Sequence, residues 1–196
     1  MRQLILLILV HGISLSEGRA QSLANYSVMR NTGLTYSSVA AMGSSFGGWR
    51  NTGTMTQDDN RSVSTPIGFD FWFNGVRYTD FSISTNGFLD FSSSGDVGGP
   101  QPDDFGYDNS AFTSSGAANA TRPAIAPFYD DLTIQGGTGS LGSSMKYSLE
   151  GTAPSRSLTV EWKNMAVYQN STPDLNFQVQ LVESTGVVKL SYGVMN

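Results

Sequence analysis

The sequence predicts an all-β protein, an antiparallel β-sandwich that carries a long loop rich in Gly, Ser and Asp. Apolar and polar residues alternate over short segments, which is the period of a strand and not of a helix. Asn-Gly pairs at 74–75 and 86–87 separate such segments and favour tight hairpin turns. After residue 20 no amphipathic helix pattern appears, and 196 residues suit one domain. Together these features indicate two packed antiparallel sheets.

The first 20 residues have the pattern of a secretory signal peptide. Arg2 precedes an apolar run over residues 4–10, and the small residues Gly18 and Ala20 suit cleavage after Ala20. The run is too short to span a bilayer, which needs about 20 apolar residues. We therefore expect a secreted or cell-surface protein, with no membrane insertion after the signal has been cleaved.

Residues 21–65 are expected to form loops and edge strands that pack on the sandwich, and residues 66–196 to form the sandwich domain itself. The first strand of that domain alternates apolar residues with polar ones and glycine, which gives one buried aromatic face. The apolar residues are Ile67, Phe69, Phe71 and Phe73. The turn at 74–75 then leads into a second strand over residues 76–83, which completes a hairpin.

A third short strand is predicted over residues 88–91. Residues 92–122 lack periodicity and are rich in Ser, Gly, Asp, Pro and Ala, so they are predicted as a long insertion loop. Strand patterns then return over residues 124–132, 145–149, 158–163, 177–182 and 187–192. The sequence ends three residues after Gly193, directly after a strand pattern. We therefore expect the sandwich to be truncated at its C-terminal end and to belong to a larger protein with further domains.

Four of these segments resemble, in the same order, the blocks of nidogen-like extracellular domains. They are residues 81–91 (FSISTNGFLDF), 122–132 (RPAIAPFYDDL), 158–165 (LTVEWKNM) and 176–181 (NFQVQL). Related modules occur in secreted and cell-surface proteins of bacteria, and the resemblance covers about residues 66–193. It implies an extracellular β-rich module associated with adhesion or matrix assembly, with no catalytic residues to carry over. We expect its partner to be an extracellular protein or glycan.

The residue types restrict the chemistry of the mature chain. His11, the only histidine, lies in the signal segment, and the sequence contains no cysteine. Catalysis by Ser-His-Asp or Cys-His groups and zinc sites built on Cys or His are thus excluded. The formal charge is −5, and Lys and Arg are scattered, so the basic surface that binds nucleic acid is missing.

The acidic residues do not form a recognisable catalytic pair. The mature chain has only three glutamates, Glu150, Glu161 and Glu183. Glu161 alternates with Trp162 on a predicted strand and is expected to point outward. Because a glycosidase needs two carboxylates on either side of its sugar site, we expect the protein not to be an enzyme.

Carboxylates remain the best candidates for a metal site, and no other cofactor is indicated. Asp58 and Asp59 lie in a polar loop, whereas Asp130 and Asp131 follow an apolar strand segment. Oxygen ligands from loops at one end of a sandwich suit Ca²⁺, but adjacent acidic residues are also common in turns. If the strand continues, Asp130 and Asp131 point to opposite faces, so that only one of them faces a given site.

Aromatic side chains leave a second function open, that of a carbohydrate-binding or carbohydrate-processing domain. Trp72 is expected to point away from the Phe face of its strand, and Tyr107, Tyr129 and Tyr168 lie in or next to loops. Exposed rings can stack on sugars, although aromatic residues more often fill cores. The leading hypothesis is a non-catalytic module for adhesion or matrix contact, with the carbohydrate-directed domain as its alternative.

Overall fold

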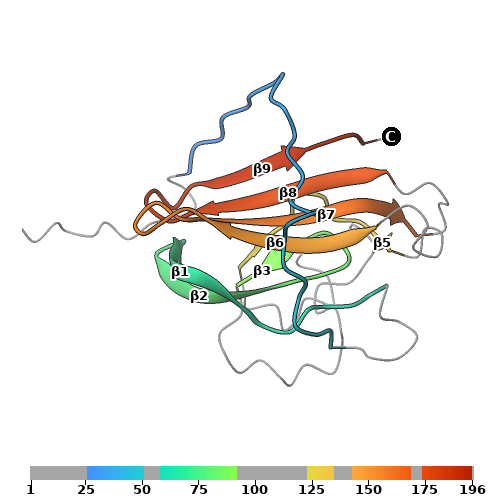
Figure 1. Ribbon diagram of the computed structural model, residues 1–196, viewed down its shortest axis with the longest axis horizontal. Helices are drawn as coiled ribbons and strands as arrows, with labels where there is room; N and C mark the ends of the chain where they lie inside the picture. Colours follow the sequence, from blue (N-terminus) through green and yellow to red (C-terminus); the bar gives the residue numbers. More distant parts are fainter. Residues whose placement is uncertain (1–25, 51–57, 92–122, 135–142, 169–173, 196) are drawn as a thin grey trace, which may run out of the picture.

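The computed structural model describes residues 26–50, 58–91, 123–134, 143–168 and 174–195, and these residues form two antiparallel sheets without a helix. The two sheets lie face to face (Figure 1). The predicted all-β class with two antiparallel sheets is therefore confirmed. The predicted signal peptide at 1–20 and the insertion loop at 92–122 lie outside the described residues and stay predictions.

The first sheet has four strands in the order β1 (Thr65–Phe73), β2 (Val76–Ile83), β3 (Leu89–Asp90) and β4 (Ala124–Ile125). β1 and β2 form the predicted hairpin, in which Phe73 pairs with Val76. Asn74 and Gly75 both have positive φ, 51° and 77°. A two-residue turn of this kind requires positive φ at both positions, which explains the Asn-Gly pair.

The second sheet has five strands. β5 (Leu132–Thr133), β7 (Ser157–Val167), β8 (Leu175–Val182) and β9 (Val188–Tyr192) follow one another, and β6 (Ser144–Glu150) also pairs with β7. β7 is the longest strand and pairs with β5, β6 and β8, so it organises this sheet.

The prediction of one strand over residues 124–132 is wrong. The structure has two short strands there, β4 in the first sheet and β5 in the second, and the chain crosses between the sheets over residues 126–131. Pro127 has no amide hydrogen to donate to a neighbouring strand, so it favours the break. Its carbonyl oxygen instead accepts a hydrogen bond from the hydroxyl of Tyr192, at 2.7 Å.

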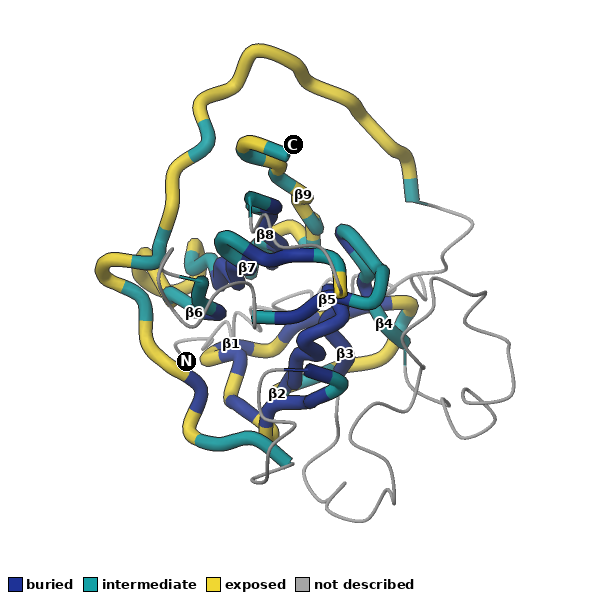
Figure 2. Tube along the Cα trace, turned by 90° about the vertical axis from the view of Figure 1, so that its right-hand side faces the viewer, coloured by how far each residue is buried: buried dark blue, intermediate teal, exposed yellow. Residues whose placement is uncertain are grey.

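The core lies between the inner faces of the two sheets, where buried positions gather (Figure 2). Along β1 the buried and exposed positions alternate without exception, as the sequence predicts. Phe71 stacks on Phe91 in the first sheet, with ring centroids 5.6 Å apart. In the second sheet, Trp162 stacks on Phe177 at 5.3 Å. Burial of such large apolar side chains is the main source of stability in a chain without disulfides.

Glu161 points to the outer face of its sheet, as the alternation predicts, and is nevertheless fully buried. The segment over residues 36–39 covers it, and Figure 1 shows residues 26–50, in blue, crossing β6, β7 and β8. The carboxylate accepts hydrogen bonds from the hydroxyls of Tyr36 at 2.7 Å and Ser38 at 3.0 Å, and from the amide of Val39 at 3.1 Å. Burial and the neighbouring carboxylate raise the pKa of Tyr36, so this tyrosine stays a donor.

Truncation of core aromatic residues tests this assignment of faces. We expect Phe71→Ala and Trp162→Ala each to lower the free energy of unfolding by ~3–5 kcal/mol, because each removes a fully buried ring. Trp72→Ala is the matched control, since Trp72 follows Phe71 on the same strand but is 53% exposed, and it should cost less than about 1 kcal/mol. Urea unfolding measures all three. Similar losses for Phe71→Ala and Trp72→Ala would contradict the assigned faces.

Candidate functional site

The candidate site is built around the turn over residues 84–87, which follows β2. The indole nitrogen Nε1 of Trp162, on the second sheet, donates a hydrogen bond to the carbonyl oxygen of Ser84 at 2.9 Å. Gly87 has a φ of 80°, and a Cβ at this position would lie 1.8 Å from the carbonyl oxygen of Phe128. Only glycine fits there, because the positive φ and the nearby carbonyl oxygen of Phe128 both exclude a side chain at position 87.

The loop over residues 58–61 is fastened to this turn by its backbone. The amide of Thr85 donates to the carbonyl oxygen of Asn60 at 2.9 Å, and the amide of Asn60 donates to Oγ1 of Thr85 at 2.9 Å. Arg61 is fully buried and forms an ion pair with Asp90 on β3. Sequence analysis did not find this pair, because an arginine within a polar segment carries no pattern that marks it as buried.

The side chain of Asn86 connects this loop with β5. Its Nδ2 donates to Oδ1 of Asp59 at 3.0 Å, and its Oδ1 accepts from the amide of Leu132 at 3.0 Å. Sequence analysis identified Asn86 as a turn residue only. The Asn-Gly pair is the signal that marks the turn, but the two partners of the side chain lie far away in sequence and leave no local trace.

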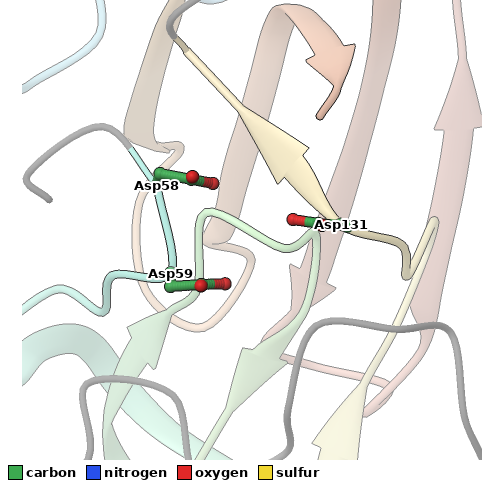
Figure 3. A group of neighbouring side chains, drawn as sticks. All are labelled: Asp58, Asp59 and Asp131. Carbon is green, nitrogen blue, oxygen red and sulfur yellow. The ribbon is translucent and has the colours of Figure 1, made fainter. Parts of the chain in front are cut away.

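Three of the four predicted metal-site residues come together at this point. Asp58, Asp59 and Asp131 each offer a carboxylate oxygen, and these oxygens lie within 4.8 Å of one another. In Figure 3 the carboxylates of Asp58 and Asp59 point toward Asp131, and the carboxylate of Asp131 points back toward them. We call these three residues the acidic cluster. Asp130 does not belong to it, because its Oδ1 accepts a hydrogen bond from the amide of Asp131 at 2.9 Å.

Asp58 is the most enclosed member of the acidic cluster. The residue is 6% exposed, and its Oδ1 is buried without a hydrogen-bond partner. Burial, together with the negative charges of Asp59 and Asp131, raises the pKa of Asp58 to about 6. The pKa of Asp131 is also raised, by burial and by the charges of Asp59 and Asp130. The cluster therefore concentrates negative charge in a partly dehydrated place.

A sandwich of two antiparallel sheets, with a loop cluster at one end, defines the class of this protein as an all-β module. The chain matches the model of the NIDO-related family over residues 25–196, and it belongs to this nidogen-related family. The resemblance to nidogen-like domains is thereby confirmed. No curated protein and no solved structure matches the chain.

Family membership suggests an extracellular module. Among the described residues, no helix has the length and apolar character that crossing a membrane requires.

The raised pKa of Asp58 predicts a distinct pH dependence of stability when divalent cations are absent. The folded state holds the proton of Asp58 up to about pH 6, whereas the unfolded chain releases it near pH 4. The proton thus stabilises the folded state below about pH 4, and this contribution is lost as the pH rises to about 6.

Urea unfolding in EDTA at pH 4.5 and pH 7 measures this contribution, with Asp58→Asn as the comparison. We expect the wild type to lose on the order of 1 kcal/mol more than the variant between these two values. Subtracting the loss of the variant from that of the wild type removes the effect of other groups, such as Glu183, whose pKa is lowered to about 2 by Arg156. An identical pH dependence in both proteins would contradict the enclosed position of Asp58.

Proposed function

We propose that this chain is a non-catalytic, secreted or cell-surface module that serves adhesion or matrix contact within a larger protein. Membership of the nidogen-related family over residues 25–196 is the observation that carries the proposal. The signal pattern at 1–20 supports export, and the absence of cysteine and of any histidine beyond His11 supports a role without catalysis. The partner is an extracellular protein or a glycan, and nucleic acid does not fit a formal charge of −5.

The environments of the glutamates support a role without hydrolysis. Glu161 is buried beneath residues 36–39 and accepts hydrogen bonds from several donors. Glu183 forms an ion pair with Arg156, and Glu150 lies exposed at the end of β6. Glu161 and Glu183 are thus engaged in contacts within the fold. A glycosidase instead needs two carboxylates that face one sugar.

The acidic cluster also fits poorly with an acid-base role on a polysaccharide. Its Asp58 has a raised pKa, which is typical of a general acid. However, Oδ1 of Asp58 is buried, and a general acid must come within hydrogen-bond reach of the bond that it protonates. We therefore assign the cluster no step in catalysis.

One surface feature favours the alternative of a carbohydrate-binding domain. Trp72 is 53% exposed on the outer face of the β1–β2 hairpin, and in the pairing of the two strands it lies opposite Arg77. Arg77 donates to Asp70 on the neighbouring strand at 2.9 Å. An exposed tryptophan beside an ion pair can stack on a sugar ring, and it can also anchor a protein contact.

Binding assays against a glycan array and a panel of extracellular matrix proteins, together with a polysaccharide hydrolase panel, test the proposal. We expect binding without turnover. Trp72→Ala should weaken binding at least about tenfold if this residue anchors the ligand, because tryptophan anchors dominate such contacts. Leu190→Ala is the control, since Leu190 is exposed to a similar degree, 44%, on β9.

The outcomes separate the candidates. Turnover of any polysaccharide contradicts the non-catalytic role, and glycan binding that Trp72→Ala removes favours the carbohydrate-binding domain. Binding to a matrix protein alone supports adhesion. A chain that binds neither class of partner contradicts the proposed function.

A further inference from the structure

The acidic cluster carries an inference that does not depend on the proposed function. We propose that Asp58, Asp59 and Asp131 bind one Ca²⁺ ion, which joins the loop before β1 to the chain that enters β5. The ion would thereby connect the two sheets at one end of the sandwich, because β1 belongs to the first sheet and β5 to the second.

A buried oxygen without a partner is the observation that distinguishes this cluster from ordinary surface acids. The residue Asp58 is 6% exposed, and its Oδ1 has no hydrogen-bond donor. Figure 3 shows its carboxylate pointing into the cluster. Burial of a carboxylate oxygen without a donor costs free energy, and a bound cation is one of the few groups that offset this cost.

The spacing of the carboxylates suits calcium. Oxygen ligands lie about 2.3–2.6 Å from Ca²⁺, so oxygens on opposite sides of the ion are about 4.6–5.2 Å apart. The ligand oxygens of the cluster lie within 4.8 Å of one another, so none is too far from the others to share one calcium ion. Mg²⁺ requires shorter bonds in nearly ideal octahedral geometry, and loops from two sheets meet that demand less readily.

The chemistry of the ligands also favours a hard cation. All three residues offer carboxylate oxygens, and the chain has no cysteine, which excludes the thiolate ligands that select softer metals. Three carboxylates carry more negative charge than one divalent ion neutralises. A divalent cation therefore relieves their mutual repulsion, which a monovalent ion does less effectively.

The cluster is held in place by hydrogen bonds from outside it. Nδ2 of Asn86 donates to Oδ1 of Asp59, and the amide of Tyr168 donates to the carbonyl oxygen of Asp131 at 2.6 Å. Asp59 has a positive φ of 45°, a conformation that the adjoining contacts of Asn60 with Thr85 fix. Ligands that are already oriented lose little entropy when the ion binds, and this strengthens binding.

Calorimetric titration of the purified full chain with CaCl₂, after removal of metal with EDTA, tests the proposal, and thermal melts in EDTA, calcium and magnesium accompany it. We expect one calcium ion per chain. If Kd is ~10⁻⁵ M, calcium at ~1 mM should raise the melting temperature by about 5–11 °C, and magnesium should raise it by less than half as much.

Two neighbouring substitutions provide a matched comparison. Asp131→Asn removes a ligand and should weaken calcium binding at least about tenfold. Asp130→Asn removes the same charge from the same bend, and its amide oxygen can still accept the hydrogen bond from the amide of Asp131. Its affinity for calcium should therefore stay within about threefold of the wild type.

The possible results divide clearly. A calcium isotherm with one site, lost in Asp131→Asn and kept in Asp130→Asn, supports the proposal. Equal melting temperatures in EDTA, calcium and magnesium overturn it. Equal shifts by both cations in the wild type and both variants also overturn it, because they indicate charge screening instead of a site. Failure of the adhesion assays leaves these results unaffected.

Discussion

The hydrogen bond from Trp162 to the carbonyl oxygen of Ser84 is the contact on which this end of the sandwich depends. Trp162 lies in the middle of β7 and stacks on Phe177, so its indole nitrogen has one fixed direction. The bond crosses the core and holds the turn that follows β2 against the second sheet. Asn86 is a member of that turn, and its two hydrogen bonds orient the loop at Asp59 and the start of β5. A contact between the sheets therefore determines where the loop carboxylates meet.

Burial of polar groups at two places gives this chain specificity that an apolar core alone does not provide. Arg61 and Asp90 are both enclosed near the first sheet, and Glu161 is enclosed beneath residues 36–39 on the second. A charged group without its partner would be costly at either place, so each favours one arrangement of loop on sheet. Residues 26–50 are thus held on a defined face of the sandwich, although they form isolated bridges and no strand of their own.

Much of the fold was predictable because local residue patterns encode it. Alternation over β1 and the Asn-Gly pair at 74–75 predicted the first hairpin and its buried face, and both are present. The strand predicted over 124–132 was wrong, because apolar residues such as Ile125 and Leu132 look alike whether they enter one sheet or two. For Glu161, alternation predicted the correct face, but it could not reveal a distant segment that covers this face.

The candidate site was predictable in its residue types and not in its geometry. The sequence named four aspartates, and their meeting depends on contacts between segments that lie far apart in the chain, through Asn86 above all. Asp130 was included because adjacent acids look equivalent in a sequence. The bend over 130–131 turns its side chain toward the neighbouring amide instead. Knowledge of which loops share one end of the sandwich is needed to choose among such residues.

The central claim is that this contact between the sheets builds a calcium site before the ion arrives, and a crystal structure of the protein grown with calcium tests it most directly. The account predicts one strong density peak within about 2.3–2.6 Å of carboxylate oxygens from Asp58, Asp59 and Asp131. It also predicts that Asn86 keeps both of its hydrogen bonds. An electron-density map without this peak, from crystals that contain millimolar calcium, would contradict the account.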